Sequence, residues 1–312
     1  MVNQFKVSVV IPSFNRAHLI EQILPSYFQP EVGEVILVDD CSTDNTEEVM
    51  RTLQQRFPTL QYIRQSKNQK QAAAKNAGIL AARYPYVYFG DDDSFITPGC
   101  ISQLLAPIES GMADIVGAKA IYMDPHEEVS QLHSIIERRK RVGNPIGNIN
   151  KLQIDFTWDT PCLQAVALVQ ACFMISTENA RSIKFDQHLY TGNGYREETD
   201  FLVRAADLGL RIFYQPAAFQ INLPRIQSTG GSRSSNRWRY EISTLRNNWA
   251  FLKKNEAALR SKFGLTWPLW VVQAYFSLSR SNYLAMALAQ TVFPNLYDSL
   301  RRLKARMGRK AL

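Results

Sequence analysis

The first 120 residues alternate between short apolar runs and stretches with the period of a helix. The apolar runs are rich in β-branched residues and predict strands at 7–12, 35–38 and 86–89, with weaker strands at 60–64 and 114–117. Between these runs, apolar residues recur at three- and four-residue steps, which predicts helices near 19–24, 49–57 and 72–82. An alternation of strands and helices favours right-handed crossovers and a mostly parallel sheet. The pattern therefore predicts an α/β fold.

After residue 120 the pattern is less regular and then becomes helical. An apolar run covers 165–175, and a helix is predicted from Glu197 to about Leu208, where Gly209 supplies a stop. From about residue 238 the reading is helical, with one apolar stripe of Ile242, Leu245, Trp249 and Leu252. We expect two halves of one α/β domain over 1–120 and 121–235, followed by a helical extension with a basic tail over 236–312.

Polar residues gather directly after three of the predicted strands. They are Ser13, Asn15 and Arg16 after the first strand, Asp39 and Asp40 at the end of the second, and Asp91, Asp92 and Asp93 after the run at 86–89. Open α/β sheets bind their ligands outside the carboxyl ends of the strands. The sequence therefore predicts a ligand site at this edge of the sheet.

Three adjacent carboxylates repel one another unless a cation or solvent compensates them. A hard divalent cation that bridges to substrate phosphates is the usual compensation, because Mg²⁺ is held by one or two carboxylates together with phosphate oxygens. In an extended loop we expect Asp91 and Asp93 to point to one side and Asp92 to point away. The alternative is a solvated acidic turn before Pro98.

The pair Asp39 and Asp40 has two interpretations. It caps the following turn at 41–44, or it accepts hydrogen bonds from the base and ribose of a nucleotide. The chain has no GxGxxG after its first strand and no GxxxxGK[ST] motif, which argues against a dinucleotide-binding dehydrogenase and a P-loop enzyme.

Charge changes this picture little. There are 36 Lys and Arg against 28 Asp and Glu, a net charge of +8. Six of these cations and no acid lie in 301–310, so the first 300 residues carry 8 − 6 = +2. A nucleic-acid coat along the whole chain is therefore not expected, and nucleic acid is not a predicted partner.

Cysteine usage and hydropathy indicate a protein kept in the cytosol. Four scattered cysteines without CxxC or metal-ligand spacing are expected to be buried or half-buried thiols in a reducing compartment. The N-terminal residues lack the apolar core of a signal peptide, and no stretch of 18 uncharged apolar residues predicts a spanning helix.

Five motifs, in order and spacing, resemble family 2 glycosyltransferases with the GT-A fold. They are VSVVIPSFNR at 7–16, VDDCSTD at 38–44, AKNAG at 74–78, FGDDD at 89–93 and GYREETDF at 194–201, with Phe185 and Asp186 matching the segment before the last. The resemblance covers about 1–235. It implies a Rossmann-like, mostly parallel sheet flanked by helices, a nucleotide-diphosphate sugar donor and a divalent cation, Mn²⁺ or Mg²⁺.

The resemblance also implies roles for individual residues. Donor contacts fall on Pro12, Ser13, Asn15, Arg16, Asp39, Asp40, Lys75, Asp91 and Asp92, and a loop at 230–233 that some members close over the diphosphate adds Arg233. Asp91 and Asp93 form the acidic pair that holds the metal. Glu198 takes the place of the catalytic base, with Glu197 beside it. Taken without the family, these two glutamates complement a helix dipole, and 230–233 is equally an interdomain turn.

Three positions depart from the family pattern. Lys70 stands where members often have Gly, and Lys75 replaces the usual Arg, so a diphosphate contact would be a point charge. Asn222 stands where members often carry a metal-ligating His, which puts a third protein ligand in doubt.

The resemblance predicts a metal-dependent, inverting, hexosyltransferase-like enzyme. Its acceptor would be a glycan, a lipid-linked glycan or another precursor of a cell-surface polysaccharide. One alternative is a nucleotidyltransferase acting on sugar phosphates, and another is a non-catalytic protein that binds membrane surfaces. The sugar, the nucleotide and the oligomeric state stay open.

The segment 267–312 joins two apolar stretches, interrupted by Arg280, to the basic tail. Trp and Tyr beside Arg and Lys suit a helix at the surface of an anionic membrane, which would place the enzyme peripherally on the inner face of the plasma membrane. The alternative is a helical hairpin packed on the catalytic domain.

Overall fold

The computed structural model describes residues 6–140, 147–152, 155–224, 226–231 and 237–292. One sheet runs through it in the order β3-β2-β1-β4-β8-β6-β9-β5, and β7 pairs with β9. The strands are β1 (Val7–Ser13), β2 (Val32–Asp39), β3 (Leu60–Arg64), β4 (Tyr86–Phe89), β5 (Ser94–Ile96), β6 (Ile115–Tyr122), β7 (Gln164–Ala165), β8 (Phe173–Ser176) and β9 (Ile212–Asn222).

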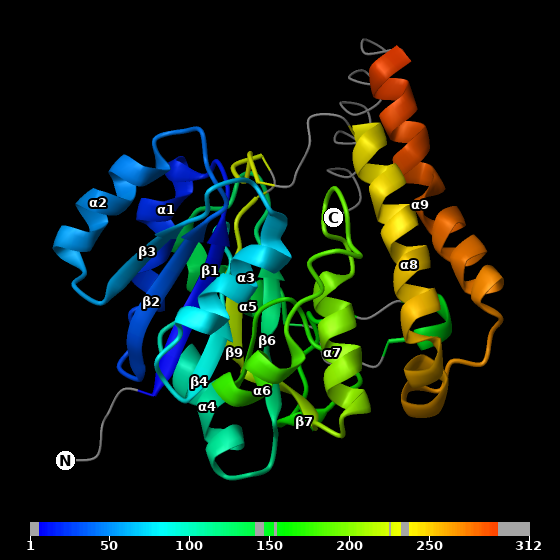
Figure 1. The fold of residues 1–312 in the computed structure, drawn as a ribbon, viewed down its shortest axis with the longest axis horizontal. Helices are drawn as coiled ribbons and strands as arrows, with labels where there is room; N and C mark the ends of the chain where they lie inside the picture. Colours follow the sequence, from blue (N-terminus) through cyan, green and yellow to red (C-terminus); the bar gives the residue numbers. More distant parts are fainter. Residues whose placement is uncertain (1–5, 141–146, 153–154, 225, 232–236, 293–312) are drawn as a thin grey trace.

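The helices lie on both faces of this sheet and at one end of the molecule (Figure 1). They are α1 (Ala17–Ile23), α2 (Thr46–Arg56), α3 (Lys70–Ala81), α4 (Cys100–Glu109), α5 (Leu132–Arg138), α6 (Thr177–Ile183), α7 (Glu197–Asp207), α8 (Arg237–Phe263) and α9 (Leu269–Val292). Short 3-10 turns are η1 (Leu24–Tyr27), η2 (Val129–Gln131) and η3 (Ile149–Lys151). The predicted α/β fold is confirmed.

Parallel pairing is confined mainly to the first half of the sheet. The strands β3, β2, β1 and β4 are parallel, as predicted, and β6 is parallel to β9. The strand β8 is antiparallel to both β4 and β6, and β5 and β7 are antiparallel to β9. The sheet is therefore mixed. The sequence pattern did not predict β5 and β9, whose pairing joins residues 94–96 to 220–222.

Alternate residues of the central strands enter two hydrophobic cores, one on each face of the sheet. On β1, Val9 and Ile11 belong to the core beneath α1, α2 and α4, whereas Val10 belongs to the core beneath α3, α6 and α7. A strand buried on both faces reads as a continuous apolar run. This burial explains why the first strands were recognisable as apolar runs in the sequence.

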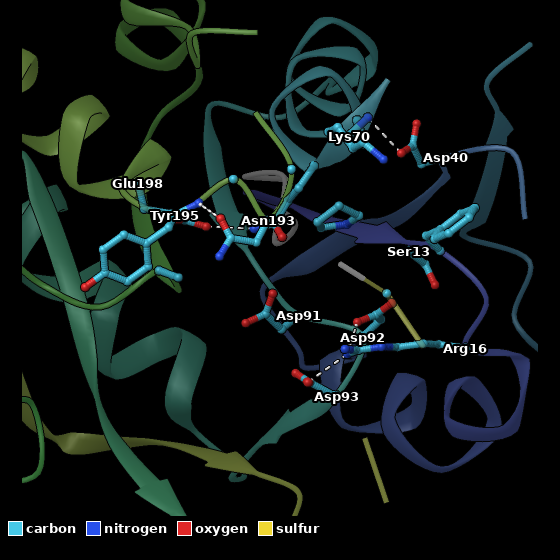
Figure 2. Close-up of a pocket in the computed structure, with 18 of the residues that line it drawn as sticks. Ser13, Arg16, Asp40, Lys70, Asp91, Asp92, Asp93, Asn193, Tyr195 and Glu198 are labelled. Carbon is cyan, nitrogen blue, oxygen red and sulfur yellow. Dashed lines mark hydrogen bonds and ion pairs between the residues drawn. The ribbon is translucent and has the colours of Figure 1, made fainter. Parts of the chain in front are cut away.

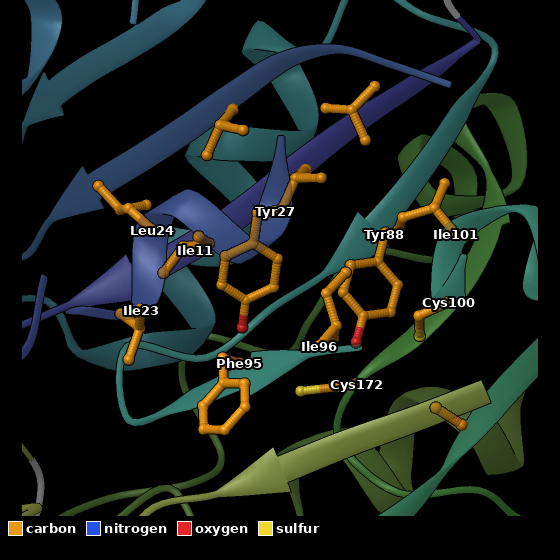
Figure 3. Packing of buried hydrophobic residues seen from close by; sticks show 14 of the residues in the cluster. Ile11, Ile23, Leu24, Tyr27, Tyr88, Phe95, Ile96, Cys100, Ile101 and Cys172 are labelled. Carbon is orange, nitrogen blue, oxygen red and sulfur yellow. The ribbon is translucent and has the colours of Figure 1, made fainter. Parts of the chain in front are cut away.

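The first core also supports the acidic loop that follows β4. Tyr27 is fully buried (Figure 3), and its hydroxyl donates to the carbonyl oxygens of Asp91 at 3.0 Å and Ser94 at 2.9 Å, between which the proton is shared. A Cβ at Gly90 would lie 2.9 Å from the Tyr27 ring. Glycine at this position therefore lets the acidic loop sit directly on the core.

The helices α8 and α9 form an antiparallel pair on the outer side of α7 (Figure 1). Arg280, which interrupts the apolar stretches of the C-terminal segment, donates from Nε and Nη2 to the carboxylate of buried Glu241, both at 2.6 Å. This ion pair joins the two helices. The tail at 301–310 lies outside the described residues.

The predicted apolar stripe lies on α8, but it is not buried along its whole length. Leu252 is buried and Leu245 and Trp249 are half-buried, but Ile242 is 58% exposed. Within the described part of the chain, none of the helices combines the length and the apolar character needed to span a bilayer.

All four cysteines lie among the described residues and are free thiols. Cys100 and Cys172 are buried and Cys41 is half-buried, as expected, but Cys162 is exposed because it lies in the irregular segment before β7.

Candidate functional site

A cavity of about 470 Å³ opens at the carboxyl ends of β1, β2 and β4 (Figure 2). Its walls come from the loops after these strands, from α3, from the N-terminus of α7 and from α8. The lining residues include Pro12, Ser13, Arg16, Asp40, Lys70, Gln71, Asp91, Asp92, Asp93, Tyr122, Asn193, Tyr195, Glu198, Gly231 and Tyr240. The cavity thus brings together residues that are far apart in sequence, at the edge predicted for a ligand site.

The three aspartates after β4 share this cavity, but not in the expected orientation. One guanidinium nitrogen of Arg16, Nη1, lies 2.6 Å from Asp92 Oδ1 and 2.7 Å from Asp93 Oδ2. Asp92 therefore does not point away from Asp93, because the loop turns at this point and a buried cation holds both carboxylates. Burial alone would lower the pKa of Arg16, but Asp92 and Asp93 raise it above its ordinary value.

Asp91 stands apart from the Arg16 contact (Figure 2). Its Oδ2 accepts a hydrogen bond from the thiol of Cys172 at 3.6 Å. Burial, reinforced by the charge of Asp93, raises the pKa of Asp91 to about 7. A carboxylate that is costly to ionise in the free protein is one that an added cation would stabilise.

Asp39 and Asp40 accept hydrogen bonds from neighbouring strands and loops around the cavity. Asp39 is fully buried and accepts hydrogen bonds from the Tyr62 hydroxyl at 2.6 Å and Arg64 Nη1 at 2.8 Å. Asp40 lines the cavity and accepts from the backbone N–H groups of Gln69 at 2.6 Å and Lys70 at 2.8 Å. Burial raises the pKa of Asp40 despite these donors.

Lys70 explains one departure from the family pattern. Its backbone has a φ of 73°, a left-handed conformation that favours glycine, and family members often have Gly there. In this conformation the N–H of Lys70, at the start of α3, donates to Asp40. The other residue noted as a departure, Asn222, lies in β9, and its side chain donates to the carbonyl oxygen of Ile121 at 3.3 Å.

The glycine-containing loop at 230–231 lies against Arg16 at the wall of the cavity. The N–H of Gly231 donates to the carbonyl oxygen of Phe14 at 2.9 Å. A Cβ at Gly231 would lie 2.8 Å from Arg16 Nη2, so a larger residue would push against the guanidinium. Arg233 lies outside the described residues. Asn15 is not among the residues that line the cavity, and its Oδ1 accepts from the N–H of Thr43 at 2.7 Å.

Glu198 faces the cavity from the first turn of α7. Its Oε1 accepts from Lys75 Nζ at 2.6 Å and from Gln71 Nε2 at 2.7 Å, both on α3. Lys75 is 1% exposed and its ammonium lies 5.0 Å from the ring centroid of Phe185. The predicted donor contact Lys75 is thus placed behind Glu198. Burial opposes the charge of Lys75, but the neighbouring glutamates raise the pKa of Lys75 far above its ordinary value.

Glu197 is a different kind of acid from its neighbour. It is 2% exposed, its Oε1 has no hydrogen-bond partner, and Lys75 Nζ is 3.6 Å away from that atom. Burial, together with the charge of Glu198, raises its pKa well above the ordinary value. The two glutamates therefore differ, since burial makes Glu197 hard to ionise whereas Glu198 faces the cavity beside a fixed counter-ion.

The contribution of α8 to the cavity was not predicted from the sequence. Asn193 lines the cavity, and its Nδ2 donates to Thr244 Oγ1 at 2.7 Å and to the carbonyl oxygen of Tyr240 at 3.2 Å. Gly192 allows this approach, since a Cβ there would lie 2.4 Å from Ser243 Oγ. The paired glycines at 192 and 194, both with positive φ, were the available signal of a constrained loop.

Comparison with known proteins agrees with this geometry. The profile described as "Glycosyl transferase family 2" matches residues 8–177, more than half of the chain. A curated relative named "GalNAc(5)-diNAcBac-PP-undecaprenol beta-1,3-glucosyltransferase" from Campylobacter jejuni is 33% identical over 115 residues, which are 36% of this chain and 37% of the relative. The match spans about a third of the length of this relative, and about a third of two further curated relatives.

Solved structures resemble the chain over most of its length. The mannosyltransferase PcManGT from Pyrobaculum calidifontis, in complex with GDP-Man and Mn²⁺, has a TM-score of 0.57 and 17% identity, and the match covers 98% of this chain and 81% of that one. TarS 1-349 from S. aureus, in complex with UDP-GlcNAc, has a TM-score of 0.53 and 17% identity, covering 87% and 78%. Similarity at this level of identity speaks for the fold.

Proposed function

The chain belongs to glycosyltransferase family 2 and has the GT-A fold, and from this premise we propose that it transfers a sugar from a nucleoside-diphosphate sugar to an acceptor hydroxyl with inversion. The observation that carries the proposal is the arrangement of one cavity. Acidic residues after β4 line one part of it, and Glu198, held by Lys75, faces it from α7. In an in-line displacement, the acceptor oxygen bonds to the anomeric carbon while the bond from that carbon to the diphosphate breaks.

Glu198 is the proposed base. It would take the proton from the acceptor hydroxyl as the new bond forms, and the nucleoside diphosphate would leave with the electron pair of the broken bond. The contact with Lys75 Nζ at 2.6 Å holds the carboxylate of Glu198 in place at the cavity. A positioned base contributes about 10²–10⁴-fold to the rate. Glu197 lies beside Glu198, and burial raises the pKa of Glu197 well above its ordinary value.

The donor set fits a divalent cation bound together with the substrate. In the described part of the chain, no cluster of three or more His, Cys, Asp or Glu side chains could hold a metal. Asp91 and Asp93 nevertheless offer hard carboxylate oxygens at the cavity, and Mg²⁺ or Mn²⁺ suits two carboxylates completed by phosphate oxygens. A bound cation would supply Lewis-acid stabilisation of the leaving diphosphate. Arg16 supplies a fixed positive charge beside the same acids.

A lipid-linked glycan is the proposed acceptor. The relative from Campylobacter jejuni is named for an undecaprenol-linked one, and the basic residues of the C-terminal segment suit an enzyme on the inner face of a membrane. We assign Tyr195 and Tyr240 to the acceptor side, because they line the cavity at the end where α7 and α8 meet.

A product assay tests the proposal. Incubation with nucleoside-diphosphate sugars and Mn²⁺ should release a nucleoside diphosphate, whereas a nucleotidyltransferase would release pyrophosphate. Glu198→Gln should lower transfer about 10²–10⁴-fold and leave donor binding nearly unchanged. The matched control is Glu178→Gln, which makes the same change in the first turn of α6, at an exposed position. NMR of the product should show the inverted anomer.

Two results would sink parts of the proposal. Release of pyrophosphate would mean that the enzyme is a nucleotidyltransferase. An unchanged rate in Glu198→Gln would mean that Glu198 is not the base. Asp93→Ala provides the check on the donor side, where activity and nucleotide binding with Mn²⁺ should both fall. If both stayed intact in that variant, the acidic loop would have no part in binding the donor.

A further inference from the structure

Basic residues recur at every seventh position on the outward face of α8. Arg239, Arg246 and Lys253 are exposed, and seven residues make nearly two helical turns, so these side chains lie in one line over about 21 Å. Ile242, 58% exposed, and half-buried Trp249 lie between them on the same face. Lys253 Nζ is 5.8 Å from the ring centroid of Trp249. We call these five residues the α8 stripe.

The acids of α8 are engaged elsewhere. Glu241 is buried and pairs with Arg280 of α9, and Glu256 pairs with Arg260 at 2.9 Å, beyond the end of the stripe. The sequence 239–253 therefore presents cations and apolar groups outward without an exposed acid of its own. The packing of α8 on the molecule uses other residues, such as Phe251 and Leu252, which are fully buried.

The stripe begins beside the cavity. Tyr240 lines the cavity and is adjacent in sequence to Arg239. Asn193, on the loop before α7, donates to the carbonyl oxygen of Tyr240 at 3.2 Å, which fixes the cavity wall to the first turn of α8. A flat surface that contacts the stripe would therefore lie close to one edge of the cavity.

We propose that the α8 stripe docks on the headgroup layer of an anionic lipid bilayer. Charge complementarity and the interleaved apolar residues favour this partner, since an interfacial helix combines Arg and Lys with Trp or Ile that enter the headgroup region. Each cation near such a surface strengthens binding about fivefold. The link to a lipid-linked acceptor rests on the proposed function, whereas docking itself does not.

Sedimentation of the full-length chain with vesicles tests the docking. Vesicles of equal parts phosphatidylglycerol and phosphatidylcholine should bind the protein, and phosphatidylcholine alone should not. The variant Arg239→Gln/Arg246→Gln/Lys253→Gln should weaken binding about a hundredfold. The control Arg51→Gln/Arg56→Gln/Lys184→Gln removes the same charge from exposed positions elsewhere and should change binding less than about twofold. Ile242→Gln should weaken binding with no change of charge.

Failure of docking is distinguishable from failure of the enzyme. Both triple variants should keep the wild-type nucleotide-binding affinity, because neither set of residues lines the cavity. Equal loss of vesicle binding in the two triple variants would mean that net charge suffices, and full retention in the α8 variant would assign binding to another segment. Either result, or equal binding of the wild type to neutral vesicles, would overturn the proposal.

Discussion

Lys75 is a single buried cation on which the chemistry of Glu198 depends. Its ammonium lies 2.6 Å from Glu198 Oε1 and 3.6 Å from Glu197 Oε1, in a site that is almost closed to water. Removing a cation from such a site raises the pKa of the carboxylates that remain, because burial disfavours their charged form. The residue is therefore a positioning residue for the proposed base.

We expect Lys75→Met to move the acid limb of the pH profile of kcat/KM upward, because the variant loses the buried cation beside the proposed base. Gln71→Leu, which removes the neutral donor on the same oxygen, should move it less. The profile is measured with a fixed donor and acceptor. If Lys75→Met instead raised KM for the donor and left the acid limb in place, Lys75 would contact the diphosphate, as the family resemblance implied.

The sequence indicated which residues line the cavity far better than how they pair. The aspartates after β4 could be predicted because their position depends on a local rule, namely that polar residues follow a buried strand at a ligand-binding edge. The contact of Lys75 with Glu198 joins residues 123 positions apart, and that of Arg16 with Asp92 joins residues 76 apart. Such pairs depend on the packing of α3 on α7 and on the turn after β1, which no local pattern contains.

At the scale of elements, α7 and α8 are joined by a polar cluster around Asp200. Asp200 is fully buried and accepts from Asn255 Nδ2 at 2.8 Å, Arg204 Nε at 2.9 Å and Lys254 Nζ at 3.0 Å. Lys254 also donates to Asp186 Oδ2 at 2.8 Å. The cluster fixes the helix that carries Glu198 against the helix that completes the cavity.

Asp186 makes this contact sensitive to acid. Burial would raise its pKa, but Lys254 and the N–H groups of His188 and Leu189 outweigh burial and lower it from 3.8 to about 2. The folded state therefore binds a proton less readily than the unfolded chain. This group stabilises the fold above about pH 4, by an amount that solvent screening reduces, and its contribution is lost as the pH falls to about 2.

We expect Asp186→Asn to be less stable than the wild type at pH 7 and to lose less stability between pH 4 and pH 2. Urea unfolding at a series of pH values measures both effects. Asp207→Asn, an exposed position at the end of α7, is the matched control and should follow the wild-type curve. An Asp186→Asn curve parallel to that of the wild type would mean that other carboxylates dominate the acid limb.

How well a strand could be predicted from the sequence depends on how far away in the sequence its pairing partners lie. The first strands were predicted within a few residues because both faces of each are buried and a crossover helix separates them. The strands β5 and β9 were missed because β5 is three residues long and β9 includes a proline and a register shift against β6. Their partners are distant in sequence, so the local period carries little information about them.

At the scale of the whole molecule, the C-terminal helices contribute to a core that also contains the central strands. Phe251 and Leu259 of α8 and Val272 of α9 belong to the same cluster as Val10 of β1 and Phe89 of β4. The expected boundary at 236 therefore separates segments in sequence, whereas one apolar cluster extends across it. Shared burial of this kind couples the folding of the helical extension to that of the sheet.

We expect the chain to unfold in one cooperative transition. Phe251 is fully buried, and its ring centroid lies 5.6 Å from the guanidinium of Arg196, just before α7. Phe251→Ala should lower the free energy of unfolding by about 3–5 kcal/mol, and loss of helix and of nucleotide binding should coincide in denaturant. The helical signal is followed by circular dichroism and binding by fluorescence of a labelled nucleotide. Leu80→Ala, at an exposed position on α3, should cost far less. The opposite outcome is two separate transitions, with nucleotide binding retained after the first. That result would show that α8 and α9 fold independently, because a destabilised extension would then leave the cavity of the sheet domain intact.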